Sequence, residues 1–230
     1  MLIHVGAHQL GKLALDGSVA SIDEPPGRFP APAWSADGAS LVFASGSGGS
    51  QHLVVTDASG ENERELVTFD GGIRFVLSRD STHLAYQVTG GGRNDPAGRG
   101  LWVLDLATGK VQRVSPEPAL AFFWSPDGDR LLFLGVETAG GTTWGRWHVW
   151  DGRGSFPMAR FRPSETLARN YLQFFDQYAQ SLSFWAPDGS AFAYAGTGGS
   201  GATGIWVQPA RHDAQPVRVA DGVFAARSPH

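Results

Sequence analysis

Short runs of alternating apolar and polar residues recur along the whole chain, and this period of two predicts β-strands. Four of these runs share a longer pattern, in which an acidic turn is followed, four and six residues after its Asp, by two large apolar residues. The apolar pairs are Leu41/Phe43, Leu84/Tyr86, Leu131/Phe133 and Phe192/Tyr194. The phrases that contain the turns occupy 34–38, 77–81, 124–128 and 185–189. Such a repeat predicts similar units that bury their apolar faces against one another.

The repeats predict an all-β fold, a β-propeller of four-stranded blades in one domain spanning 1–230. The first two repeats are about 45 residues long, the length of one blade. The predicted blades cover 29–69, 72–115, 119–160, 181–221, and 223–230 together with 1–24. Joining the two ends would close a ring of five blades and leave no unpaired strand edge. A piece of a longer propeller is the alternative.

The third spacing is longer because it contains an insert at 160–180, in which a helix is predicted at about 163–179. Ser164 is a suitable N-cap, and Glu165 places an acid in the first turn. The large side chains that follow have the spacing of one helical face. They are Leu167, Tyr171, Phe174, Phe175 and Tyr178.

Composition narrows the class of protein. The 230 residues include 31 Gly and 14 Pro, which favours many turns, and the net charge of −4 without a basic block argues against nucleic acid as a partner. There is no cysteine, so disulfides and thiolate metal sites are excluded. No run is long enough to predict membrane insertion, and the first residues lack a signal-peptide pattern. The chain is expected to be cytoplasmic if complete, and periplasmic or extracellular if a leader was removed.

The phrase Trp-Ser-Pro-Asp-Gly-x-x-Leu-x-Phe, complete at 124–133, resembles the propeller repeats of the TolB family and related WD-repeat-like propellers. The copies at Trp34 and Trp185 each lack one of the Ser-Pro residues, and the copy at Leu77 keeps only Ser78 and Asp80. The resemblance covers nearly the whole chain except the insert. It implies the fold but no single function, because such blades occur both in translocation-associated periplasmic proteins and in accessory domains of peptidases. Nothing resembles the N-terminal domain of TolB.

The acids and tryptophans of the repeat have structural interpretations. Asp-Gly is typical of tight turns in which the carboxylate accepts backbone N–H bonds, and the tryptophans are expected to pack between blades. The predicted innermost strands carry Arg74 and Arg227 but no Asp or Glu, which argues against a glycosidase. No catalytic residue, metal site or cofactor is predicted.

The irregular segments should gather on one side of the ring, where binding usually resides. They are the Gly-rich segments 46–49, 90–100, 137–145 and 196–204, together with the insert. Our first hypothesis is therefore a non-enzymatic module that binds a protein or peptide on this loop-rich face. The candidate binding residues are Arg74, Arg93, Arg99, Trp144, Tyr171, Phe174, Phe175, Asp176, Tyr178 and Arg227.

Two alternatives stay open at this point. One is a hydrolase or lyase at the central mouth, with Arg74 and Arg227 holding an anionic substrate and an acid supplied by Asp70 or Glu137. The other is an accessory or sensor domain from a longer chain.

Overall fold

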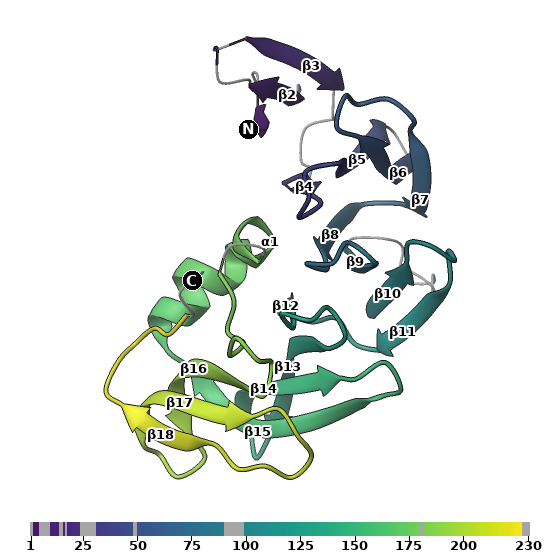
Figure 1. Ribbon diagram of the computed structural model, residues 1–230. Coiled ribbons are helices and arrows are strands. Elements are labelled where there is room, and N and C mark those ends of the chain that lie inside the picture. Colours follow the sequence, from purple (N-terminus) through teal and green to yellow (C-terminus); the bar gives the residue numbers. More distant parts are fainter. Residues whose placement is uncertain are drawn as a thin grey trace.

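A computed structural model describes residues 2–4, 10–13, 16, 18–23, 31–47, 50–89, 99–179 and 182–226. All strand pairs are antiparallel, and the sheets follow one another along an arc with the helical insert on its inner side (Figure 1). This arrangement confirms the all-β prediction.

The first half of the chain forms three separate sheets. A three-stranded sheet contains β1 (Leu2–His4), β2 (Leu10–Leu13) and β3 (Val19–Asp23). The next sheet contains β4 (Ala33–Trp34), β5 (Ser40–Ser47), β6 (Ser50–Asp57) and β7 (Arg64–Phe69). The third contains β8 (Gly72–Leu77), β9 (His83–Thr89), β10 (Leu101–Asp105) and β11 (Val111–Ser115). Both four-stranded sheets fall within predicted blades.

The second half forms one sheet of seven strands. Its first four are β12 (Ala121–Trp124), β13 (Leu131–Ala139), β14 (Thr142–Trp150) and β15 (Ser155–Pro163). The others are β16 (Ala191–Gly198), β17 (Thr203–Pro209) and β18 (Val217–Ala220). Two predicted blades are joined because the end of β15 pairs with the end of β16, with Arg162 opposite Thr197. The sequence did not predict this connection.

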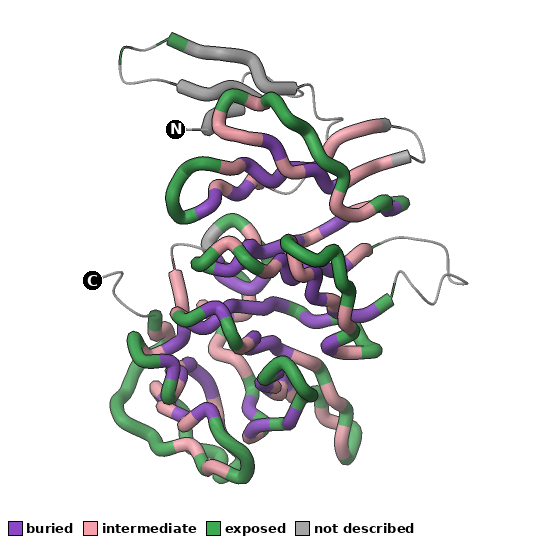
Figure 2. Tube along the Cα trace, turned by 45° about the vertical axis from the view of Figure 1, so that its right-hand side comes forward, coloured by how far each residue is buried: buried purple, intermediate pink, exposed green. Residues whose placement is uncertain are grey.

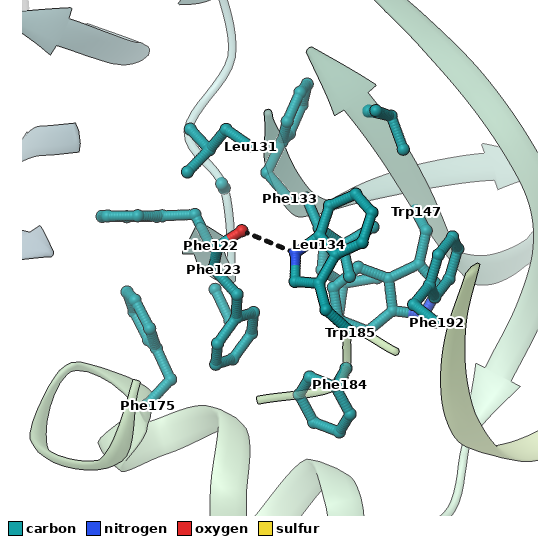
Figure 3. Close-up of a cluster of buried hydrophobic side chains, with 14 of the residues drawn as sticks. Phe122, Phe123, Leu131, Phe133, Leu134, Trp147, Phe175, Phe184, Trp185 and Phe192 are labelled. Atoms are coloured by element: carbon teal, nitrogen blue, oxygen red, sulfur yellow. Dashed lines mark hydrogen bonds between the residues drawn. The ribbon is translucent and has the colours of Figure 1, made fainter. Parts of the chain in front are cut away.

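The largest core lies among the seven-stranded sheet, the insert and the neighbouring sheet of β8–β11. Phe123 is fully buried, and its ring meets those of Trp147, Phe175 and Phe184 with centroids 4.9–6.4 Å apart (Figure 3). The buried stretches follow the strands, whereas the connecting turns are exposed (Figure 2). The apolar faces that the alternation predicted are therefore the faces that stack.

Two tryptophans of the repeat, Trp124 and Trp185, pack between neighbouring units, as predicted, and they also donate hydrogen bonds. The indole Nε1 of Trp124 donates to the carbonyl of Val76 at 2.9 Å, and that of Trp185 donates to the carbonyl of Phe123 at 3.1 Å. The first bond reaches β8 of the preceding sheet, and the second reaches β12 within the seven-stranded sheet.

The acids of the repeat form the predicted turns. Asp37 accepts a hydrogen bond from the Ser35 hydroxyl at 2.6 Å and from the Ala39 N–H at 3.0 Å. Asp188 accepts the corresponding bond from the Ser190 N–H at 2.9 Å. The Ser35 hydroxyl is the main cause that holds the pKa of Asp37 below its usual value. These carboxylates stabilise turns.

The insert is helical but irregular. After one turn at 165–166 it continues as a π-helical turn (Leu167–Tyr171), a 3-10 turn (Leu172–Phe174) and the short helix α1 (Phe175–Tyr178). Ser164 begins it as predicted, because its hydroxyl accepts the Leu167 N–H at 3.1 Å. The wide π turn shifts the face that is buried. Leu167, Tyr171 and Phe175 point into the core, but Phe174 is 45% exposed, so its predicted place on that face was wrong.

The two ends of the chain do not pair with each other in the described residues. Residues 223–226 form no strand, and 227–230 lie outside the described residues. Val223 instead accepts a hydrogen bond from the Ser164 hydroxyl, and the ring of Phe224 lies 4.9 Å from that of Tyr171. The number of blades and the closure of the ring stay predictions.

Candidate functional site

The longest hairpin of the described chain is formed by β13 and β14, each of nine residues. Gly140 and Gly141 connect these strands with φ of 58° and 73°, the backbone that a two-residue hairpin turn of this twist requires. The segment 137–145, predicted as a loop, therefore consists mainly of paired strand. Its register places Glu137 opposite Trp144 and Gly135 opposite Arg146.

Strand β15 adds two arginines to the same face. Arg146 lies opposite Arg160, and Gly145 lies opposite Phe161. Because side chains alternate along a strand, Phe161 points into the core while Arg160 and Arg162 point the other way. We call the resulting group the Arg–Trp platform. Its members are Glu137, Trp144, Arg146, Arg160 and Arg162.

Two guanidinium groups lie against the indole of the platform. The Cζ atom of Arg162 is 4.9 Å from the Trp144 ring centroid, and that of Arg160 is 5.8 Å away. Both distances are within the range of cation–π attraction. Trp144, predicted as a binding residue, is thus half-buried by arginines that were not predicted.

Glu137 fixes the other side of the platform. Its carboxylate oxygens lie 2.9 Å from Arg146 Nε and 3.3 Å from Arg160 Nη1. This carboxylate is held by two cations, which makes it a poor candidate for the acid of a hydrolase or lyase. Three arginines against one glutamate leave the platform with a net positive charge.

Arg162 differs from the other two arginines. Within the described part of the chain its side chain forms no ion pair and no hydrogen bond, and the only partner of the guanidinium there is the Trp144 ring. Its cross-strand neighbour Thr197 shares the same face, and the Thr197 hydroxyl lies 2.9 Å from that of Thr203. An exposed guanidinium that lies over an indole, with two hydroxyls on the neighbouring strands, can bind an acceptor from outside the chain.

Arg74 has a structural position. It lies on β8 with its Cζ atom 5.5 Å from the centroid of Phe175, and that ring is fully buried against Phe122 and Phe123. The insert therefore packs onto the innermost strands β8 and β12, and Arg74 covers one side of Phe175. Tyr171 is likewise buried, so neither aromatic ring is available to a partner.

The remaining predicted site residues are dispersed. Asp176 is half-buried on α1, and Arg99 is exposed, with its carbonyl 3.5 Å from Arg113 Nη2. Arg93, Arg227 and the side chain of Tyr178 lie outside the described residues.

The described residues contain no group of three or more His, Asp or Glu that could hold a metal ion. In the same ranges no helix has the length and apolar character needed to cross a membrane.

Solved structures with similar folds have low sequence identity to the chain. TolB from Acinetobacter baumannii matches 96% of this chain at 16% identity with a TM-score of 0.54, and the match covers 51% of TolB. The tricorn protease matches 94% at 14% identity with a TM-score of 0.60, over 22% of its length. The β-propeller domain of the trilobed protease from Pyrococcus furiosus, described as having an open velcro topology, matches 91% at 13% identity with a TM-score of 0.55, over 66% of its length.

These likenesses show the fold alone. No protein-family model matches the sequence, and neither does any curated protein sequence. The chain has a TolB-like β-propeller fold and spans about half the length of the TolB structure. This confirms the resemblance seen in the repeats.

Proposed function

We propose that the chain is a non-enzymatic binding module that engages a protein or peptide through the Arg–Trp platform. The proposal rests on the pair of arginines beside Trp144, whose Cζ atoms lie 4.9 and 5.8 Å from the centroid of its ring. Arg and Trp are the residue types most enriched among those that dominate binding energy at protein interfaces. The platform also lies on three paired strands, which hold the side chains in a fixed register.

Two of the residues predicted for the enzymatic alternative have structural partners. Glu137, one of its two candidate acids, is paired with Arg146 and Arg160, and Arg74, one of its two candidate anion-binding arginines, packs on Phe175. Strands β4, β8 and β12, which lie innermost, carry no Asp or Glu. Binding without catalysis therefore remains the better-supported function.

A random peptide library displayed on phage tests the proposal. Peptides enriched on the protein should lose binding to the Trp144→Ala and Arg162→Ala variants. The Arg113→Ala variant is the matched control, because Arg113 lies over the Trp102 ring at 5.3 Å in the preceding sheet without a second arginine. Circular dichroism would verify that each variant is folded. Failure to enrich any peptide, or enrichment that all three variants retain, would contradict the proposal.

We also propose that the scaffold closes as five blades, with the sheet β1–β3 next to β18. Val219 on β18 is 56% exposed, although Val114 and Met158 are buried at the corresponding positions of β11 and β15, the outer strands of the two preceding four-stranded units. The sheet β1–β3 has three strands where a complete blade has four. A closing sheet would cover Val219 and receive its fourth strand from the C-terminal segment.

Replacing Val219 by Asp distinguishes the two arrangements. In a closed ring the variant buries a charge, and we expect a loss of about 2 kcal/mol in the free energy of unfolding. Val111→Asp is the control, because Val111 is also exposed on an outer strand, at 45%. Equal, small effects of both changes would favour a piece of a longer propeller.

A further inference from the structure

The Arg–Trp platform contains one guanidinium that the described chain leaves without a counter-ion. Arg146 and Arg160 share the carboxylate of Glu137, whereas Arg162 contacts only the Trp144 ring within the described residues. Stacking on an indole fixes the plane of a guanidinium and leaves its N–H edge directed at solvent. Such a side chain is already ordered before a ligand binds, so binding costs less conformational entropy.

We infer that this edge binds a carboxylate, and that the ligand of the platform is an acidic peptide segment; the inference rests on the proposed peptide-binding function. The planar N–H fork of arginine matches the two oxygens of a carboxylate. The platform already holds one carboxylate, since Glu137 accepts hydrogen bonds from Arg146 Nη2 at 3.2 Å and from Arg160 Nη1 at 3.3 Å. A second carboxylate at Arg162 would repeat that chemistry on the open side of Trp144.

Neighbouring groups extend the site along the sheet. Thr197 lies opposite Arg162, and Thr203 lies opposite Thr197, with their hydroxyl oxygens 2.9 Å apart. Four groups on the four adjacent strands β14 to β17 thus follow one another across the sheet: the Trp144 indole, the Arg162 guanidinium and the two hydroxyls. An extended peptide could place an acidic side chain on Arg162 and a backbone polar group on the hydroxyls.

Local charge favours a carboxylate over a nucleic acid. Glu137 lies within the platform and would repel the closely spaced phosphates of a polynucleotide, and the chain as a whole carries a net charge of −4. A single carboxylate can instead approach Arg162 from the side away from Glu137. The carboxylate could be an Asp or Glu side chain, or the C-terminus of the peptide.

Fluorescence anisotropy with four probes tests the inference. The first is a labelled Glu-containing peptide with an amidated C-terminus, and the second is the same peptide with Gln in place of Glu. The third is the Gln peptide with a free C-terminal carboxylate, and the fourth is a single-stranded oligonucleotide of equal length. We expect the first or third probe to bind at least about tenfold more tightly than the second, because a charge-assisted pair is lost in the Gln peptide.

Variants locate the effect. Arg162→Ala should abolish the preference for the carboxylate, and Arg162→Lys should restore only part of it, because a lysine lacks the planar fork. Arg113→Ala should leave all four affinities unchanged. Tighter binding of the first probe assigns side-chain recognition, and tighter binding of the third assigns the terminal carboxylate; both support the inference.

Three outcomes would overturn it. If the Gln peptide binds as well as the Glu peptide and Trp144→Ala abolishes both, the platform binds peptides but not through a carboxylate, so the proposed function survives. If the oligonucleotide binds most tightly, the platform is a polyanion site. If no probe binds while phage selection enriches peptides sensitive to Trp144→Ala, the ligand is of another class.

Discussion

The two halves of the arc share one repeat, yet they are held together differently. Between β12 and β18 the core consists largely of aromatic rings, with Phe123 in contact with Trp147, Phe175 and Phe184. Between β4 and β11 the core is smaller and largely aliphatic, and Leu66 packs against it only half-buried. Aromatic side chains bury more area each, so the same architecture is expected to be more stable in its second half.

The junctions between sheets differ as well. The indole of Trp124 donates a hydrogen bond to β8 of the preceding sheet, and that of Trp185 donates one to β12 within the seven-stranded sheet. At the junction between the sheets that contain β4 and β8, the corresponding residue of the later sheet is Leu77, whose side chain has no donor. The insert adds contacts at the junction between β8 and β12, where Phe175 meets Arg74 and Phe122. The repeat thus defines the shape of each unit, while departures from the repeat decide how firmly neighbours are joined.

The largest expected effect comes from removing the central ring of the second half. Phe123→Ala should lower the free energy of unfolding by about 3–5 kcal/mol, because it leaves a cavity among packed rings. Urea denaturation followed by tryptophan fluorescence would measure it. The control is Phe174→Ala, whose ring is 45% exposed and whose loss should change stability by less than about 0.5 kcal/mol. Equal effects of the two changes would contradict the central role of Phe123 in the core of the second half.

An intermediate effect is expected at the hydrogen-bonded junction. Trp124→Phe should cost about 1–3 kcal/mol, because the buried carbonyl of Val76 loses its donor. The matched control is Trp102→Phe, since the indole Nε1 of Trp102 is buried without a hydrogen bond to the described residues. Both changes remove similar volume, so the difference between them measures the hydrogen bond. A control that costs as much as Trp124→Phe would show that packing alone joins these sheets.

The smallest effect concerns the turns, which both halves share. Hydrogen bonds from Ser59 and Asn62 lower the pKa of Asp57 to about 2. Because the folded pKa is below the unfolded value of about 3.9, this carboxylate stabilises the fold above that pH, and the contribution disappears as the pH falls toward 2. Thermal unfolding should be followed between roughly pH 5 and pH 2, the range in which this carboxylate titrates. Because Asp57→Asn lacks the titrating group, its melting temperature should fall less with decreasing pH than that of the unchanged protein.

The control for the turn is Asp213→Asn, at an exposed carboxylate that accepts no hydrogen bond from the described residues. This variant removes an exposed carboxylate without removing a hydrogen bond of a turn. An unchanged decline in Asp57→Asn would mean that the turn does not stabilise its carboxylate.

Local patterns in the sequence predicted most of the fold. The Asp-Gly turns and the alternating strands depend on neighbouring residues, so Asp37 and its hairpin could be predicted from a few positions. Phe174 could not, because the π turn before it depends on how Tyr171 and Leu172 pack, and an ideal helical period misplaces it.

The platform was predicted only through Trp144. The predicted blade ended at residue 160, but strand β15 continues to Pro163 because its last residues pair with β14 and β16. This pairing brings Arg160 and Arg162 over Trp144. The position of these arginines depends on the register between strands distant in sequence. The sequence hinted at it only through the Arg-x-Arg alternation at the start of the predicted insert.

The shared hydrogen bonds of β15 and β16 have a consequence for motion. Two neighbouring four-stranded units are here joined by strand pairing into one continuous sheet, with Arg162 at the seam. We therefore expect flexing that widens or narrows the arc to take place at the earlier junctions, where no strand pairing joins the sheets in the described residues. The face that carries the Arg–Trp platform would keep its shape during such flexing.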